Sequence, residues 1–470
     1  MKLTTLYCTV LALLFSCTIN AQELPRFKIN IKYSKLSATY NFIQKLSDYY
    51  PDNEYKKIFK ASKYHNSKHL GLIAQLDTLD LYKSLPFEDY PYGQKLPLQT
   101  ISLIEKSLIN SDSVEDFASQ AFGVVTNDRF FAFLKIISTF EPIFQELIYL
   151  PNKKEFDNKI DELSQFVASN NMSQFFETGL TFYSTDWDDS IPIDIAIIPS
   201  IENGGFTATA FMNNAVSEVP INFKHNDILF CVLMHEIFHL QFDGQPLHLK
   251  KDIRRWFSQH SSVNSQYAYL LLDEALATAL GNGYVFEKFN NMLDPQDWYN
   301  VKYINLMAQK TYPLVKNYIK NKKSIDQNFV DQYVKIYDDN FSTWPEELDH
   351  ILTYRYILSD NKKDFDYFRR TYRYASRFVR SLSINQDELE RMKETPVTKV
   401  VIVSEENMFK LNLIKNTFHE LEDWSFNAEN DFTHTAFLDD KTTLIIVNVK
   451  NKNLEKIFED EFTNKKMHKN

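Results

Sequence analysis

The stretch that most constrains the fold of this chain is ILFCVLMHEIFHLQFDG, residues 228–244. Its large apolar residues predict a buried helix, yet the middle of that helix carries His235, Glu236 and His239. Burying polar groups without hydrogen-bond or ionic partners is strongly unfavourable. A fold that buries this helix must therefore provide a partner for two imidazoles and a carboxylate.

These three polar residues form the pattern H-E-x-x-H, and its spacing favours a metal ion as that partner. Residues four apart on an α-helix lie on one face, so both imidazoles can reach the same ion. Glu236 follows the first ligand directly and can take a proton from a zinc-bound water, whose pKa the metal lowers. The pattern predicts a zinc ion (Zn²⁺) on His235 and His239, with Glu236 as the catalytic base. The alternative is a pair of core histidines satisfied by hydrogen bonds.

A catalytic zinc ion also needs a third protein ligand and an open fourth position. One large class supplies a histidine six residues after the second one, but this chain has Gln245 there. The favoured ligand is Glu274 in LLLDEALATAL, a nearly all-apolar helix whose alanines allow close packing. Asp273 points about 100° away and could orient an imidazole instead. The alternative for these two acids is packing against Arg or Lys.

H-E-x-x-H followed by a separate helix containing Glu-Ala-x-Ala resembles the gluzincin group of zinc metallopeptidases. The resemblance implies zinc on His235, His239 and Glu274, with Glu236 as general base and acid. It also implies a zincin-like fold, in which a twisted sheet precedes the active-site helix and a helical subdomain follows it. Thermolysin-like members often carry an acid where this chain has Thr278, so the subfamily is not identified.

In enzymes of this kind an edge strand of the sheet pairs with the extended substrate. The segment GGFTATAFMNN, residues 204–214, is our candidate for that strand. A Tyr or His usually stabilises the oxyanion, and the sequence singles out none of its candidates. Those candidates are Tyr267, Tyr284, His248, His260, Tyr354 and Tyr356.

The patterns along the chain predict an α+β fold that is predominantly helical. Residues 22–180 are expected to be a helical N-terminal region. Residues 181–395 are expected to form the zincin-like catalytic region, with a small sheet before the active-site helix and a helical subdomain after it. Residues 396–470 are expected to be a small α/β segment. The DEALA helix is expected to end at Gly281-Asn282-Gly283.

The first 21 residues have a lysine near the start, a short apolar stretch and a small residue at a cleavage position. This pattern is typical of a secretory signal peptide cleaved after Ala21, and it predicts export to the periplasm or the exterior. A lipid anchor at Cys17 is the second interpretation. After cleavage Cys231 is the remaining cysteine, and we expect it to be buried core rather than a ligand. No transmembrane segment is predicted.

The net charge of −10 repels phosphate backbones, so nucleic acid is not an expected partner. The patterns together predict a secreted zinc metallopeptidase that hydrolyses a peptide or protein. One alternative is a zincin-fold binding or scaffold protein whose metal is structural or absent. For a structural zinc, Asp243, His248 or His260 would complete the set of ligands around the ion. Another is a zinc hydrolase of non-peptide amides or esters.

Overall fold

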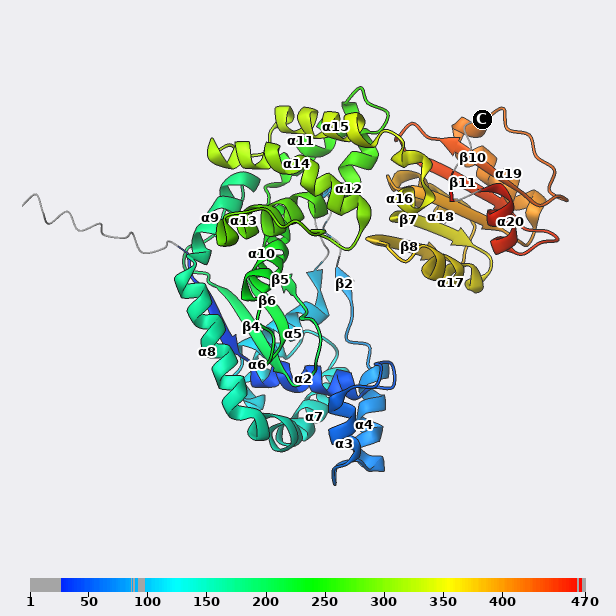
Figure 1. Ribbon diagram of the computed structural model, residues 1–470. Helices are drawn as coiled ribbons and strands as arrows, with labels where there is room; N and C mark the ends of the chain where they lie inside the picture. The colour runs from blue at the N-terminus through cyan, green and yellow to red at the C-terminus, as the bar shows by residue number, and fades with distance from the viewer. Residues whose placement is uncertain (1–26, 86, 88, 92–97, 463–464, 467–470) are drawn as a thin grey trace, which may run out of the picture.

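The computed structural model describes residues 27–85, 87, 89–91, 98–462 and 465–466. The predicted signal peptide, with its alternative anchor at Cys17, lies outside these residues. Figure 1 shows a mostly helical α+β chain with a helical N-terminal region, a small sheet, a group of helices and a C-terminal sheet. None of the described helices combines the length and the apolar character needed to cross a membrane.

The N-terminal region is built from helices, most of which share an aromatic-rich core of their own, whereas the last of them packs into the main core of the chain. Side chains of Ser34, Asn53, Asn66 and Ser113 cap four of them by accepting from backbone N–H groups of the first turn. The helices are α2 (Lys35–Leu46), α3 (Glu54–Lys60), α4 (Ser67–Thr78), α5 (Thr100–Asn110), α6 (Val114–Ala121), α7 (Asn127–Phe144), α8 (Lys153–Ser169) and α9 (Met172–Tyr183). A π-turn η1 (Gln145–Tyr149) and a 3-10 turn η2 (Leu150–Asn152) join α7 to α8, and a short hairpin of β2 (Ser84–Leu85) and β3 (Leu98–Gln99) precedes α5.

The first strand, β1 (Ile29–Tyr33), lies in the region predicted to be helical, so that prediction was wrong at this point. It pairs in parallel with β4 (Ile193–Ser200) at one edge of a four-stranded sheet. A strand of 5 residues leaves little periodicity of its own, and its partner comes from far along the chain.

The other side of this sheet is a hairpin of β5 (Thr209–Phe211) and β6 (Asn214–Pro220), which gives the order β1-β4-β6-β5. β6 runs parallel to β4, and β5 is the antiparallel edge strand. Met212 adopts a positive φ of 56° at the turn of the hairpin. The predicted edge-strand segment 204–214 therefore contains β5, the turn and the first residue of β6.

Helix α10 (Asn226–Asp243) follows the sheet and carries the H-E-x-x-H residues. A group of helices comes after it, in the order that the sequence predicted. They are α11 (Leu247–Gln259), α12 (Ser265–Thr278), the π-turns η3 (Ala279–Val285), α13 (Phe286–Asn290), α14 (Lys302–Lys320), α15 (Gln327–Phe341), the 3-10 turn η4 (Trp344–Glu346) and α16 (Leu348–Ile351).

The DEALA helix α12 does not end at Gly281 and Gly283, as the sequence predicted, but continues as π-turns through Val285. A Cβ atom on Gly281 would lie 2.7 Å from the carbonyl oxygen of Cys231 and 2.8 Å from Cβ of His235. The glycine therefore serves close packing between two helices rather than chain reversal. A short-range pattern cannot distinguish these two uses of glycine.

The C-terminal sheet has the order β10-β11-β9-β7-β8, in which every pair is parallel except β10 with β11. Its strands are β7 (Tyr354–Ser359), β8 (Arg377–Ser381), β9 (Thr398–Val403), β10 (Phe432–Phe437) and β11 (Thr443–Asn448). The accompanying helices are α17 (Lys362–Thr371), α18 (Gln386–Glu394), α19 (Asn407–Thr417), the 3-10 turn η5 (His419–Leu421) and α20 (Leu454–Glu461). The sheet thus begins before residue 396, because two short strands in a helix-rich stretch form its β7 and β8 edge.

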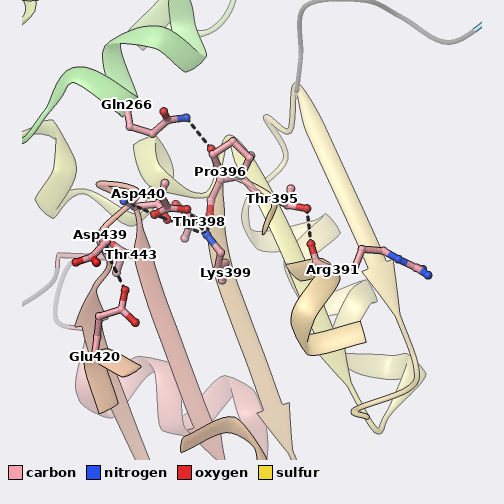
Figure 2. Close-up of polar contacts among 12 residues, drawn as sticks. Gln266, Arg391, Thr395, Pro396, Thr398, Lys399, Glu420, Asp439, Asp440 and Thr443 are labelled. Atoms are coloured by element: carbon pink, nitrogen blue, oxygen red, sulfur yellow. Dashed lines mark hydrogen bonds and ion pairs between the residues drawn. The ribbon is translucent and has the colours of Figure 1, made fainter. Parts of the chain in front are cut away.

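The C-terminal sheet holds the first turn of α12 through buried hydrogen bonds (Figure 2). The side-chain amide of Gln266 donates to the carbonyl of Pro396 at 2.7 Å. The Tyr267 hydroxyl lies 3.1 Å from the hydroxyls of both Thr398 and Thr443. The helix that carries Asp273 and Glu274 is therefore anchored at its start by β9 and β11.

Candidate metal centre

Three donor atoms from two helices converge at one point of the molecule. Nε2 of His235 lies 3.1 Å from Nε2 of His239, and Oε2 of Glu274 lies 3.6 Å and 3.5 Å from these two nitrogens. Ligands about 2.1 Å from a tetrahedral zinc ion are about 3.4 Å apart. The structure therefore brings the three predicted ligands together at separations that suit one zinc ion.

The carboxylate of Glu274 fits a cation better than it fits the metal-free surroundings. Its side chain is 24% exposed, against 5% for His235 and 19% for His239. Among the described groups, its Oε2 atom is buried without a hydrogen-bond partner. A buried carboxylate oxygen with no donor is unfavourable, and a metal ion bound by the same oxygen removes that penalty.

Both imidazoles also have a polar neighbour at Nδ1, the ring nitrogen that does not face Glu274. Oδ1 of Asp273 lies 2.7 Å from Nδ1 of His239, and the hydroxyl of Thr278 lies 3.5 Å from Nδ1 of His235. Contacts of this kind fix the ring so that the opposite nitrogen faces the metal. Asp273 thus occupies the orienting position that the sequence suggested for it, and Thr278 occupies the corresponding position for the other ring.

The convergence depends on close packing between α10 and α12. Ala275 and Ala277 of α12 are fully buried, and Gly281 in the following turns touches the backbone of α10 at His235. Small residues allow the two helix axes to approach, so a carboxylate on α12 reaches imidazoles on α10.

The surroundings of the site shift the pKa values of the two glutamates in opposite directions. Burial raises the pKa of Glu236, although the neighbouring His235 and His239 oppose this effect, and a raised pKa makes the carboxylate a stronger base. Burial would also raise the pKa of Glu274, but the two histidines outweigh it and hold that pKa well below its ordinary value. Glu274 therefore stays ionised, as a metal ligand must.

Tyr299, which the sequence analysis did not single out, lies at this site. Its ring stacks on His235 with centroids 5.7 Å apart and planes at 27°. Burial and the carboxylates of Glu274 and Glu236 raise the pKa of its phenol, which therefore stays protonated. Tyr299 lies in an irregular stretch before α14, so no periodic pattern could relate it to α10.

Of the oxyanion candidates named from the sequence, Tyr354 is influenced by the carboxylates of Glu274 and Asp273. Burial and the nearby Glu274 raise its pKa well above the ordinary value. Tyr267 bonds the C-terminal sheet instead, Tyr356 donates to Glu388, and His260 faces Asp331.

Within the described part of the chain, no fourth His, Cys, Asp or Glu joins the three donors. Asp243, His248 and His260, which could have closed the shell, are not part of the group. Cys231 is buried, as expected, and burial raises the pKa of its thiol well above the ordinary value. Three protein donors without a fourth among the described residues is the number found in catalytic zinc sites, whereas structural zinc sites have four.

No protein-family model, curated protein or solved structure matches this chain. Its chemistry is therefore inferred from the residues of the site. They provide three convergent donors, an adjacent carboxylate with a raised pKa and a protonated phenol, the set of groups that hydrolysis of a carbonyl compound requires.

Proposed function

We propose that this chain is an exported zinc metallopeptidase of the gluzincin type, with zinc on His235, His239 and Glu274. The observation that carries the proposal is the convergence of these three donors, at 3.1–3.6 Å, without a fourth donor among the described residues. The proposal of export comes from the N-terminal sequence.

When bound, zinc supplies Lewis acidity, which lowers the pKa of water toward neutrality and polarises a carbonyl group. Glu236 accepts the proton of the attacking water, and burial, which raises the pKa of this carboxyl group, makes it a stronger base. The same carboxyl group then gives that proton to the leaving amine. Tyr299 donates its phenol hydrogen to the carbonyl oxygen as negative charge develops there.

A peptide is favoured over a small amide or ester because a strand edge lies next to the site. β5 packs against α10 and pairs with β6 on one side. On its other side it pairs with none of the described strands. An extended peptide can add to this edge by backbone hydrogen bonds and so cross the face of α10. The observed strand, Thr209–Phe211, lies within the predicted segment 204–214.

The test compares wild type with Glu236→Gln and Tyr299→Phe on a library of unbiased peptides, with zinc content measured on each sample. General acid–base catalysis is worth about 10²- to 10⁴-fold, so Glu236→Gln should lose at least about 100-fold in kcat/KM at unchanged zinc content. Tyr299→Phe should lower kcat by about 10²-fold, since one transition-state hydrogen bond is removed.

Glu155→Gln is the matched control, because Glu155 is an exposed residue of α8 and its loss should leave the rate unchanged. Full activity of Glu236→Gln at full zinc occupancy would contradict the mechanism. Wild-type protein that binds zinc and cleaves no peptide in the library would contradict the peptidase assignment.

A further inference from the structure

The segment formed by α17 and β8 has a charge opposite to that of the chain as a whole. Residues 362–380 contain seven Lys or Arg residues and two Asp residues, whereas the whole chain has a net charge of −10. The basic residues are Lys362, Lys363, Arg369, Arg370, Arg373, Arg377 and Arg380. A local reversal of charge of this size marks a surface for an anionic partner.

Most of this positive charge is not neutralised within the fold. Arg370, Arg373 and Arg380 are exposed, and within the described chain no carboxylate lies at ion-pair distance from any of them. Of the two acids in the segment, Asp364 is buried and accepts from the hydroxyl of Ser359, so it does not screen the arginines.

β8 is an edge strand of the C-terminal sheet (Figure 1), with β7 on one side and no described strand on the other. Its free backbone edge can accept an extended chain by β-augmentation. Two copies of β8 would bring like charges together, which disfavours self-pairing. An acidic strand would meet the arginines with opposite charge, so the chemistry of this edge selects an acidic peptide.

The amino end of β8 lies next to Tyr354, whose phenol is under the influence of carboxylates of the metal centre. Tyr354, the first residue of β7, pairs with Arg377, the first residue of β8, and hydrogen-bonds the side chain of Ser376. The carboxylates of Glu274 and Asp273 act on the same Tyr354 phenol. Tyr354 therefore links the first residue of the basic edge to the carboxylates of the metal centre.

We propose that the β8 edge, with Arg373 and Arg380, binds an acidic extended peptide and thereby selects substrates rich in Asp and Glu. This inference rests on the proposed peptidase function for its link to cleavage. Binding itself requires no zinc and no hydrolysis, so the two can fail separately.

The experiment measures binding to the full-length Glu236→Gln chain by fluorescence anisotropy. The probe is a labelled ten-residue peptide with Asp or Glu at alternate positions, compared with its Asn and Gln counterpart. The acidic peptide should bind at least about 10-fold more tightly, since several ion pairs of modest strength add. An acidic peptide N-methylated at alternate residues should lose about 10-fold, because it lacks the donors for strand pairing.

The decisive variant is Arg373→Glu with Arg380→Glu, which should weaken binding of the acidic peptide by about 10-fold or more. The control is Lys251→Glu with Arg255→Glu on α11, an equal change of charge elsewhere, which should change binding less than about 2-fold. The milder Arg373→Gln with Arg380→Gln should give an intermediate loss, and thermal unfolding verifies the fold of each variant.

Equal binding of the acidic and amide peptides would overturn the proposal, as would an inorganic polyphosphate of equal charge that binds as tightly as the peptide. If wild type cleaves the amide peptide in that case, the peptidase function stands without the acidic preference. If the acidic peptide binds and is not cleaved, the docking edge stands and the peptidase function fails.

Discussion

Among the described residues, two clusters of histidine and carboxylate have donor atoms close enough to hold a metal ion, and they differ in exposure and in the direction of their donor atoms. One is formed by His235, His239 and Glu274 on α10 and α12. The other is formed by His419, Glu420 and Asp439 near the C-terminal sheet, where Figure 2 shows Glu420 and Asp439 side by side. The first lies mostly buried, whereas His419 and Asp439 are 64% and 82% exposed.

The direction of the donor atoms separates the two clusters further. In the buried cluster both Nε2 atoms face the same oxygen of Glu274. In the exposed cluster the ring of His419 bridges two acids, with Nδ1 at 3.3 Å from Glu420 and Nε2 at 3.2 Å from Asp439. The ring of His419 therefore faces a different acid with each nitrogen, whereas the two rings of the buried cluster face one shared oxygen.

Short distances between potential ligand atoms therefore do not by themselves define a metal centre. The buried cluster has rigid helices beneath it and Asp273 behind one imidazole, so its geometry is set before a metal arrives. In the exposed cluster His419 and Glu420 lie on a 3-10 turn, and His419 and Asp439 face solvent, so an ion pair between those two is weak.

The largest expected difference between the clusters is in zinc affinity. Glu274→Gln should weaken zinc binding by more than about 100-fold, because even residues that only support a ligand are worth up to about that much. Glu420→Gln removes an acid from the exposed cluster and should leave zinc content at one ion per chain. Metal analysis and competition with a chelator measure both. Loss of zinc in the Glu420 variant, or its retention in the Glu274 variant, would reverse the assignment.

The next largest expected effect is on the free energy of unfolding, through the packing between the two helices that carry the buried cluster. Gly281→Ala puts a methyl group 2.7–2.9 Å from backbone and His235 atoms of α10, and should destabilise the metal-free chain by about 3 kcal/mol. Gly71→Ala, in helix α4 with open space around it, should instead stabilise the chain by about 0.5–1 kcal/mol. Urea unfolding in the presence of a chelator compares the two. Equal effects would mean that α10 and α12 do not pack as tightly as described.

A smaller effect on stability is expected from His350, a buried histidine that has no carboxylate beside it among the described residues to favour its charged form. His350 is buried among aromatic rings, and burial lowers the pKa of its imidazole to about 3. At His239 the nearby carboxylates outweigh the effect of burial and raise the pKa well above the ordinary value. The folded-state pKa of His350 lies below its unfolded value near 6.5, so the stability linked to it is present above that pH and is lost as the pH falls.

The metal-free chain should accordingly lose about 2 kcal/mol of unfolding free energy through His350 between pH 7 and pH 5. His350→Gln should lack this part of the pH dependence. Urea unfolding of both proteins at the two pH values, with a chelator present, measures the difference. An identical pH dependence in the variant would show that His350 is not buried as described.

The sequence alone predicted those parts of the molecule whose reason lies in short-range spacing. Two imidazoles four residues apart share a helix face whatever surrounds them, and the apolar frame of residues 228–244 implied burial. The small sheet before α10 and the α/β character of residues 396–470 were predicted for the same reason, because their strands and helices carry their own periodicity.

The sequence predicted less well where an element depends on distant partners. β1, β7 and β8 are short strands within helix-rich stretches, and each is a strand because another strand lies beside it. Gly281 and Gly283 have the appearance of a helix end, but contacts with α10 and Trp298 are what require glycine there.

For the candidate site, then, the sequence determined which residues carry the chemistry on α10 and nominated Glu274 on α12. Only the tertiary structure decided that Glu274 reaches both imidazoles, that Asp273 orients His239, and that Tyr299 lies on His235. The physical reason is that a helix fixes neighbours three and four residues apart. The distance between two helices and the course of an irregular stretch are instead set by packing among residues far apart in the chain.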